Sequence, residues 1–150
     1  MKVFISFVIQ GFEQFRATAR DGVIEAGMEP VMAEDSERFP AQSLSLQKAC
    51  FEGIDESDIF VLILGQRYGD PTEIDLSAVE EEYWHARLSG PELKVFVHDV
   101  DREPQQNVFL ARIGKRESWS SMTGTSIPWG NFLTSRSWPW AIGSSASRLG

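Results

Sequence analysis

The sequence SDIFVLILGQRYGDPTEIDLSAVEEEYWHA, from Ser57 to Ala86, decides the fold. Within it, Ile59–Leu64 is an unbroken apolar run with β-branched and aromatic residues, typical of a strand buried on both faces of a parallel sheet. Residues 65–75 contain glycine and proline and are predicted to form a loop. Ser77 is predicted to cap the helix that follows, with Glu80 in the capping-box position. A buried strand, a glycine-bearing loop at its carboxyl end and a helix behind the loop are the usual place for a ligand site in an open α/β sheet.

The segments on either side of this unit alternate in the same way. Further strands are predicted at 3–7, 29–33 and 93–97, and further helices at 12–27, at 46–54 and within 102–113. Residues 34–45 are polar, contain a proline and are predicted as loop. Strands that alternate with helices form right-handed βαβ units around a parallel sheet. The sequence contains neither GxxxxGK[ST] nor GxGxxG, which argues against a P-loop ATPase and a Rossmann dehydrogenase.

The composition argues against nucleic-acid, membrane and metal-binding functions. The chain has 150 residues, enough for one domain with a real core, and a net charge of −8, which argues against a nucleic-acid partner. No stretch approaches the roughly 20 apolar residues that a membrane span needs, so we predict a cytoplasmic protein without a membrane partner. Cys50 is the only cysteine and there are two histidines, so we predict neither a disulfide framework nor a metal site.

The last part of the chain differs from the rest. Residues 1–112 hold 10 basic and 21 acidic side chains, whereas 113–150 hold four basic and one acidic. Residues 118–150 carry four of the five tryptophans and nine serines without a sustained period of 2 or 3.6. We therefore predict a domain at 1–112 and an irregular Trp/Ser-rich tail at 113–150. One hypothesis is a frameshifted or truncated reading frame, which sequencing of the downstream DNA tests; the alternative is a natural flexible or partner-binding tail.

Several motifs in one order resemble a known family. They lie at 1–6 (MKVFIS), 27–32 (GMEPVM), 49–69 (ACFEGIDESDIFVLILGQRYG) and 76–83 (LSAVEEEY). Together they resemble the domain of unknown function 4062, a family similar to TIR domains and to nucleoside 2-deoxyribosyltransferases. The resemblance covers about residues 1–112. It implies an α/β fold, a flavodoxin-like (TIR-like) three-layer sandwich with a parallel sheet of four or five strands in the order 2-1-3-4-5.

The same resemblance implies two functions. In the first, the domain is the N-terminal signalling or effector module of a defence or sensor protein, which binds a nucleotide such as NAD and cleaves its N-glycosidic bond. NAD is then a candidate substrate, and no resident cofactor is expected. In the second, the domain is a non-catalytic adaptor that acts through protein interaction and self-association. Longer relatives join such domains to NTPase and repeat modules. This chain departs from the family at Phe7, where a second small polar residue is usual.

The resemblance also implies a catalytic residue. TIR enzymes and deoxyribosyltransferases are similar in placing a glutamate on the helix after the third strand, four residues before a small residue, and Glu82 with Ala86 fits that spacing. Glu81 is the second choice. A carboxylate suits this chemistry because cleavage of an N-glycosidic bond passes through an oxocarbenium-like state. The alternative is structural, since acidic residues are favoured in the first turn of any helix.

The loop after the central strand supplies the candidate ligand-binding residues. They are Gly65, Arg67, Tyr68 and Gly69. Arg67 is predicted to hold a phosphate or ribose, Tyr68 to stack on a base, and Gly69 to let the backbone turn tightly. The alternatives are that Arg67 pairs with Asp70 or the glutamate cluster and that Tyr68 packs over the sheet end. With the strand order that the resemblance implies, Ser6 forms a second wall of this site or caps a turn.

Overall fold

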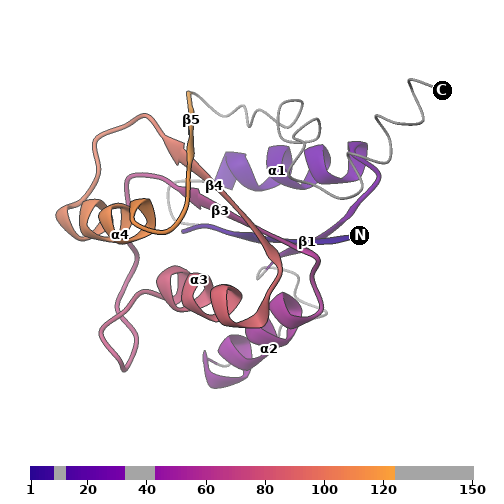
Figure 1. Cartoon of the computed structure of the whole chain (residues 1–150), viewed down its shortest axis with the longest axis horizontal. Helices are drawn as coiled ribbons and strands as arrows, with labels where there is room; N and C mark the ends of the chain where they lie inside the picture. The colour runs from indigo at the N-terminus through magenta and orange to yellow at the C-terminus, as the bar shows by residue number, and fades with distance from the viewer. Residues whose placement is uncertain (9–12, 33–42, 124–150) are drawn as a thin grey trace.

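The computed structural model describes residues 1–8, 13–32 and 43–123, and these form three layers (Figure 1). The strands are β1 (Lys2–Ser6), β2 (Glu29–Met32), β3 (Ile59–Leu64), β4 (Glu92–His98) and β5 (Ser120–Met122). The helices are α1 (Glu13–Glu25), α2 (Ser43–Asp55), α3 (Ala78–Ser89) and α4 (Pro104–Gly114). All neighbouring strands are parallel, in the order β2-β1-β3-β4-β5. The predicted flavodoxin-like α/β fold and its strand order are confirmed.

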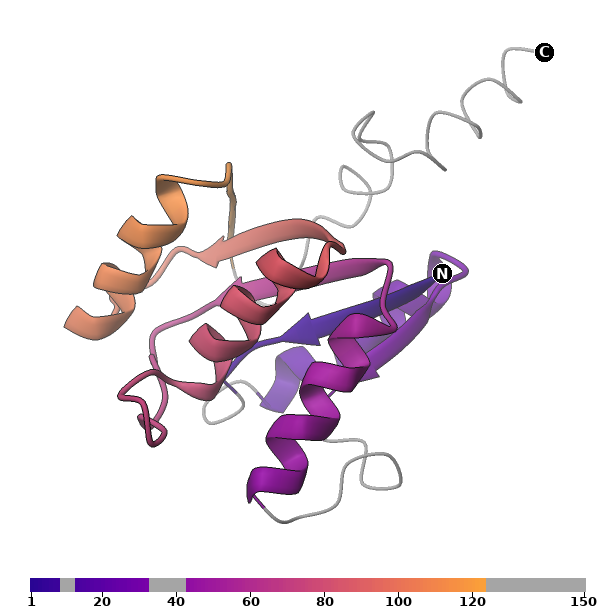
Figure 2. The same ribbon diagram turned by 60° about the horizontal axis from the view of Figure 1, so that its bottom comes forward.

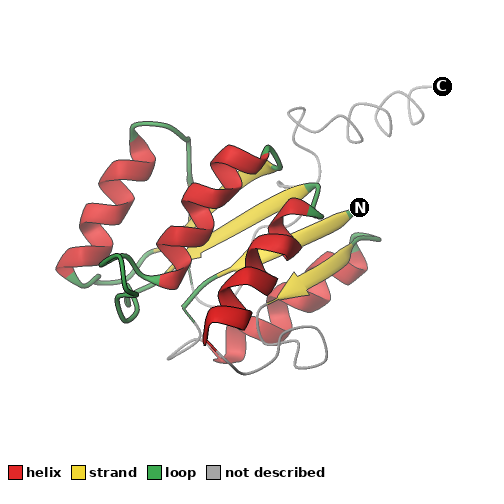
Figure 3. Ribbon diagram, turned by 90° about the horizontal axis from the view of Figure 1, so that it is seen from below, coloured by secondary structure: helices red, strands yellow, loops and turns green. Residues whose placement is uncertain are grey.

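The described helices cover the two faces of the sheet unequally. α1 lies on one face, and α2, α3 and α4 lie on the other (Figures 1 and 3). Successive residues of β1 point to opposite faces, so Val3 packs with the cluster under α1 while Phe4 packs with the cluster under α2, α3 and α4. Every residue of β3 is buried, as its unbroken apolar run predicts.

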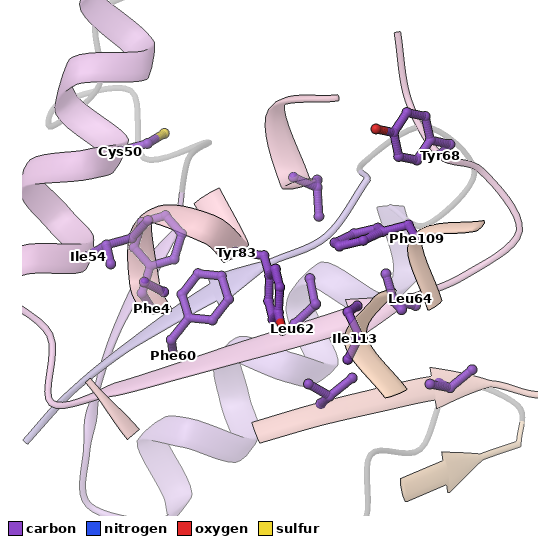
Figure 4. Packing of buried hydrophobic residues seen from close by; sticks show 14 of the residues in the cluster. Phe4, Cys50, Ile54, Phe60, Leu62, Leu64, Tyr68, Tyr83, Phe109 and Ile113 are labelled. Atoms are coloured by element: carbon purple, nitrogen blue, oxygen red, sulfur yellow. The ribbon is translucent and has the colours of Figure 1, made fainter. Parts of the chain in front are cut away.

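Aromatic side chains fix α3 and α4 over the sheet. The rings of Phe4 and Phe60 stack with centroids 5.8 Å apart, and Tyr83 meets Phe109 of α4 edge to face at 5.6 Å. Figure 4 shows Tyr83 of α3 between Phe60 and Phe109. A fully buried aromatic side chain contributes roughly 2–3 kcal/mol through the area it removes from water. This packing holds the helix that carries the three consecutive glutamates.

The ends of the helices follow the local sequence. α1 ends at a Schellman motif, in which the Met28 amide donates to the Val23 carbonyl at 3.1 Å and Gly27 takes a positive φ of 78°. The Ser77 hydroxyl caps α3 by accepting from the Glu80 amide at 3.1 Å. α2 begins at Ser43, three residues earlier than predicted, so part of the predicted loop is helical. The remainder of that loop, residues 34–42, lies outside the described residues.

Gly90 ends α3 in the left-handed conformation, at a φ of 95°. A Cβ at this position would meet no atom within 4 Å, so the cost of Gly90→Ala comes from the backbone alone. We expect this change to lower the free energy of unfolding by about 1 kcal/mol in urea denaturation. Gly114→Ala is the matched control, because its Cβ also meets nothing and its φ is not positive. Equal losses in both variants would contradict the backbone argument.

Regular structure continues past residue 112, where the sequence analysis places the end of the domain. That residue lies inside α4, and β5 pairs with β4 beyond it, with Phe96 opposite Ser120 and His98 opposite Met122. β5 has no apolar alternation because it is a three-residue edge strand, with two exposed serines and only Met122 buried. The rest of the predicted tail, with the reading-frame hypothesis, lies outside the described residues. In the part of the chain that the structure describes, no helix is long and apolar enough to cross a membrane.

Candidate functional site

A pocket of about 550 Å³ opens at the carboxyl ends of β1 and β3, between α2 and α3. Ligand pockets of this type usually measure about 300–1,000 Å³. Figure 2 shows α2 and α3 side by side over the sheet, with the loop before α3 at one end of the pair. The apolar walls include Phe7, Val8, Leu46, Cys50, Phe51 and Val79. The pocket therefore lies where an open α/β sheet places its ligands.

Two neighbouring glutamates of α3 supply the polar side of this pocket. Glu81 and Glu82 line it, and each residue keeps only 7% of its surface exposed. The Ser6 hydroxyl, at the end of β1, donates to Oε2 of Glu82 at 3.4 Å. The two oxygens of Glu81 accept hydrogen bonds from Nε2 of Gln47 on α2 and from Oγ1 of Thr72 in the loop. Three separate segments thus meet at two adjacent carboxylates.

The third glutamate, Glu80, has a different role. It is 1% exposed and accepts from the Tyr68 hydroxyl at 2.7 Å, from Nε1 of Trp84 at 2.9 Å and from the Arg112 guanidinium at 2.9 Å. The predicted capping box is only half formed, because the Ser77 amide donates to the Tyr68 hydroxyl at 3.2 Å and not to Glu80. Glu80 therefore joins α3 to α4 and to the loop, and it does not line the pocket.

Of the four loop residues that the sequence analysis proposes as ligand-binding, two line the pocket and two do not. Tyr68 and Gly69 line the pocket, and Gly69 takes a φ of +94° that a side chain would strain. The packing alternative for Tyr68 agrees with the structure, since the residue is buried and its ring centroid lies 6.1 Å from that of Phe109, and stacking on a base stays a prediction. Gly65 does not line the pocket; its carbonyl accepts from Nε2 of Gln106 at 3.1 Å.

Arg67 also lies outside the pocket lining. Its Nε is 3.9 Å from Oε1 of Glu103, and the Tyr68 amide donates to Oε2 of the same carboxylate at 3.1 Å. Glu103, which immediately precedes α4, is therefore one partner of Arg67, in addition to the predicted alternatives of Asp70 and the glutamate cluster. Arg67 thus helps to anchor the loop.

Two polar residues of the site are missed by sequence reasoning. Gln47 and Thr72 reach Glu81 from elements that precede and follow β3, and neither belongs to a spaced motif. The only available signal is position: Thr72 lies in the loop that follows the central strand, and Gln47 precedes Cys50 on the α2 face that borders α3. Among the described residues, no cluster of three or more His, Cys, Asp or Glu side chains is arranged to hold a metal ion.

A second polar contact joins α2 to α3 away from the pocket. The Asp55 carboxylate accepts from the Ser89 hydroxyl at 2.7 Å and lies 2.8 Å from Nε2 of His85. The Ser89 hydrogen bond, with smaller contributions from His85, lowers the pKa of Asp55. A lowered pKa in the folded state stabilises the protein above the usual carboxyl pKa, and this stabilisation is lost as the pH falls through the folded-state value.

We therefore expect the variant Asp55→Asn to lose less stability than the parent on acidification below about pH 4. The measurement is the urea midpoint at a series of pH values from about 6 to 3. Asp21→Asn on the exposed surface of α1 is the control, and its pH profile should follow that of the parent. Identical profiles for all three proteins would mean that this contact does not contribute.

A family model described as a domain of unknown function (DUF4062) matches residues 2–122. No curated protein matches the chain. Among solved structures, the Clostridium botulinum CMP N-glycosidase BcmB is similar with a TM-score of 0.55 and 11% identity, over 84% of this chain and 90% of that one.

Two further structures are similar to the same extent. The TIR domains of the activated Roq1 resistosome match with a TM-score of 0.54 and 20% identity, over 77% of this chain and 71% of that one. The 2-deoxyribosyltransferase of Bacillus psychrosaccharolyticus matches with a TM-score of 0.53 and 12% identity, over 88% and 90%. At these identities the likeness shows a shared fold.

Proposed function

This chain belongs to the DUF4062 family, and we propose that its domain binds a nucleotide-type ligand such as NAD in the pocket between α2 and α3 and cleaves its N-glycosidic bond. The observation that carries the proposal is the position of Glu82. This residue is 7% exposed and lines a ligand-sized pocket, and its carboxylate accepts a hydrogen bond from Ser6 at the carboxyl end of β1.

The chemistry uses groups that border this pocket. When the C1′–N bond breaks, its electron pair leaves with the base and positive charge develops on the sugar. A carboxylate held in a poorly solvated site stabilises that charge strongly. A water oxygen then bonds to C1′, and its proton passes to Glu82 and on to solvent. Glu81, fixed by Gln47 and Thr72, is positioned to accept hydrogen bonds from sugar hydroxyls.

The structural neighbours support this proposal by analogy. One is named as an N-glycosidase of CMP and another as a deoxyribosyltransferase, so two proteins of this fold act on nucleosides or nucleotides. The third belongs to an assembly that recognises a pathogen effector, which supports the proposal of a signalling or effector module. These analogies rest on fold, and the assignment to Glu82 rests on the contacts in this chain.

The test is NMR of the full chain at high concentration with millimolar NAD. The expected result is release of nicotinamide, with chemical-shift changes at residues that line the pocket, such as Gly69 and Glu82. Shift changes without release would support a nucleotide sensor and contradict the cleavage step. If no chemical shift changes and no nicotinamide is released, the whole proposal is contradicted.

The alternative function is a non-catalytic adaptor that self-associates or docks to a partner. Two observations favour it. Phe7 places an aromatic ring in the pocket wall, and Leu88 on α3 is 88% exposed, which leaves a large apolar side chain available for contact. Sedimentation of the chain over a range of concentrations tests it. A dimer that Leu88→Glu dissociates would support the adaptor, and a monomer at every concentration would contradict self-association.

A further inference from the structure

Among the residues that the structure describes, every charged side chain that lines the pocket is acidic. Asp70 and Glu73 lie at the exposed rim, and Glu81 and Glu82 lie within. Among the described residues that line the pocket there is no lysine, arginine or histidine. Arg67, the cation that the sequence places next to this loop, has its Nε 3.9 Å from the Glu103 carboxylate, outside the lining. These described carboxylates favour a cation in the pocket and oppose an anion.

The apolar walls also suit a flat cationic ring. Phe7, Phe51 and Tyr68 border the pocket. Aromatic side chains attract cations through the negative faces of their rings, and this attraction strengthens where water is excluded. A phosphate group, in contrast, needs donors such as guanidinium groups or a helix N-terminus with accessible amides. At the start of α3 the Ser77 amide donates to Tyr68 and the Glu80 amide donates to Ser77, so these two donors are already used.

The groups that could protonate a leaving base agree with this preference for a cation. A neutral base leaves as an anion unless an acid protonates it, whereas a cationic base leaves neutral when it takes the C1′–N electron pair. Both oxygens of the best-placed second carboxyl, Glu81, are engaged in hydrogen bonds with Gln47 and Thr72. With no histidine among the described lining residues, the site is equipped to release a base that needs no proton.

We propose that this pocket takes a nucleoside with a cationic base and an unphosphorylated sugar, of the N-ribosylpyridinium class, in preference to the corresponding nucleotide. The proposal rests on the N-glycosidic cleavage proposed above and changes the preferred substrate from a nucleotide such as NAD to an unphosphorylated nucleoside. The C1′–N bond breaks with both electrons going to the pyridinium nitrogen, water supplies the new C1′–O bond, and one proton is released. A 5′-phosphate on the same sugar would add negative charge beside the carboxylates and weaken binding.

Two matched comparisons test the proposal with the full chain. The first compares nicotinamide riboside with nicotinamide mononucleotide, which have the same leaving group and differ only by the phosphate. We expect kcat/KM for the riboside to be higher by about 10-fold. The second compares two inert probes, the 1-methylnicotinamide cation and neutral nicotinamide, by NMR titration. We expect the cation to bind about 10-fold more tightly.

A charge reversal at the rim provides the control. Glu73→Lys should raise kcat/KM for the mononucleotide relative to the riboside, whereas Glu29→Lys, the same change at the start of β2 and outside the pocket lining, should leave the ratio unchanged. Equal or better cleavage of the mononucleotide, or equal binding of the two inert probes, would overturn this inference and leave the proposed cleavage standing. If neither of these substrates nor NAD is cleaved, the proposed function is wrong, and the inert probes alone decide whether the pocket prefers a cation.

Discussion

Replacing Glu82 with glutamine is expected to lower the rate of N-glycosidic cleavage by about 10²- to 10³-fold. The change preserves the shape of the side chain and removes the charge that faces the developing oxocarbenium ion. The Ser6 hydroxyl can still donate to the amide oxygen, so the local packing should persist. The measurement is kcat/KM for release of the base, with the thermal midpoint of unfolding as the check that the variant is folded.

Glu81→Gln is the matched comparison, because it makes the same chemical change at the next residue. Glu81 is held by Gln47 and Thr72, so its loss should disturb the pocket wall and raise KM more than it lowers kcat. A variant of Glu81 that loses turnover while the variant of Glu82 keeps it would move the catalytic assignment to Glu81. Full turnover in both variants would mean that cleavage does not depend on this pair.

The fold is predictable from local sequence because its decisive signals are local. The apolar run Ile59–Leu64 has to be buried on both faces, and this requirement specifies a central strand with helices above and below. The same holds for Gly27 and Gly90, which end helices at positive φ. β5 could not be found in this way. A three-residue edge strand takes its stability from hydrogen bonds to β4, and no pattern in its own sequence marks it.

The site is less predictable than the fold, and the three glutamates show why. Glu80, Glu81 and Glu82 are the same residue type at consecutive positions. Their roles differ because each contacts different residues that are distant in the sequence. The Arg112 guanidinium, 32 residues from Glu80, donates a hydrogen bond to the Glu80 carboxylate and so gives it a structural role. Gln47, 34 residues from Glu81, donates a hydrogen bond to the Glu81 carboxylate. Spacing within one helix cannot supply such information.

The loop residues show a second limit of sequence reasoning. Position in the chain places Gly65 and Arg67 at the carboxyl end of β3, which is correct, but it does not say which way they face. Gln106 and Glu103, on or just before α4, hold them on the side away from the pocket lining. Tyr68 and Gly69, the next residues along, border the pocket. Tertiary contacts therefore decide which residues of this short loop border the pocket, and the local sequence does not.

The largest effect on stability is expected at Glu80. Its carboxylate is 1% exposed and accepts from Tyr68, Trp84 and Arg112, which belong to the loop, α3 and α4. Glu80→Ala removes the acceptor from a buried tyrosine hydroxyl and the counter-charge from a partly exposed arginine. We expect the free energy of unfolding to fall by about 3 kcal/mol, measured by urea denaturation. Glu73→Ala, at an exposed site on the same loop–helix unit, should change it by about 0.5 kcal/mol or less.

Glu80 is also expected to matter for activity without touching a ligand. Successive residues of an α-helix are rotated by about 100°, so Glu80 and Glu82 lie about 200° apart around α3. The contacts that hold Glu80 toward α4 therefore turn Glu82 toward β1 and Ser6. Glu80→Gln, which keeps an oxygen acceptor for Tyr68 but not the charge for Arg112, should lose less stability than Glu80→Ala and retain more turnover. Equal stability of the parent and the alanine variant would mean that this network does not set the rotation of the helix.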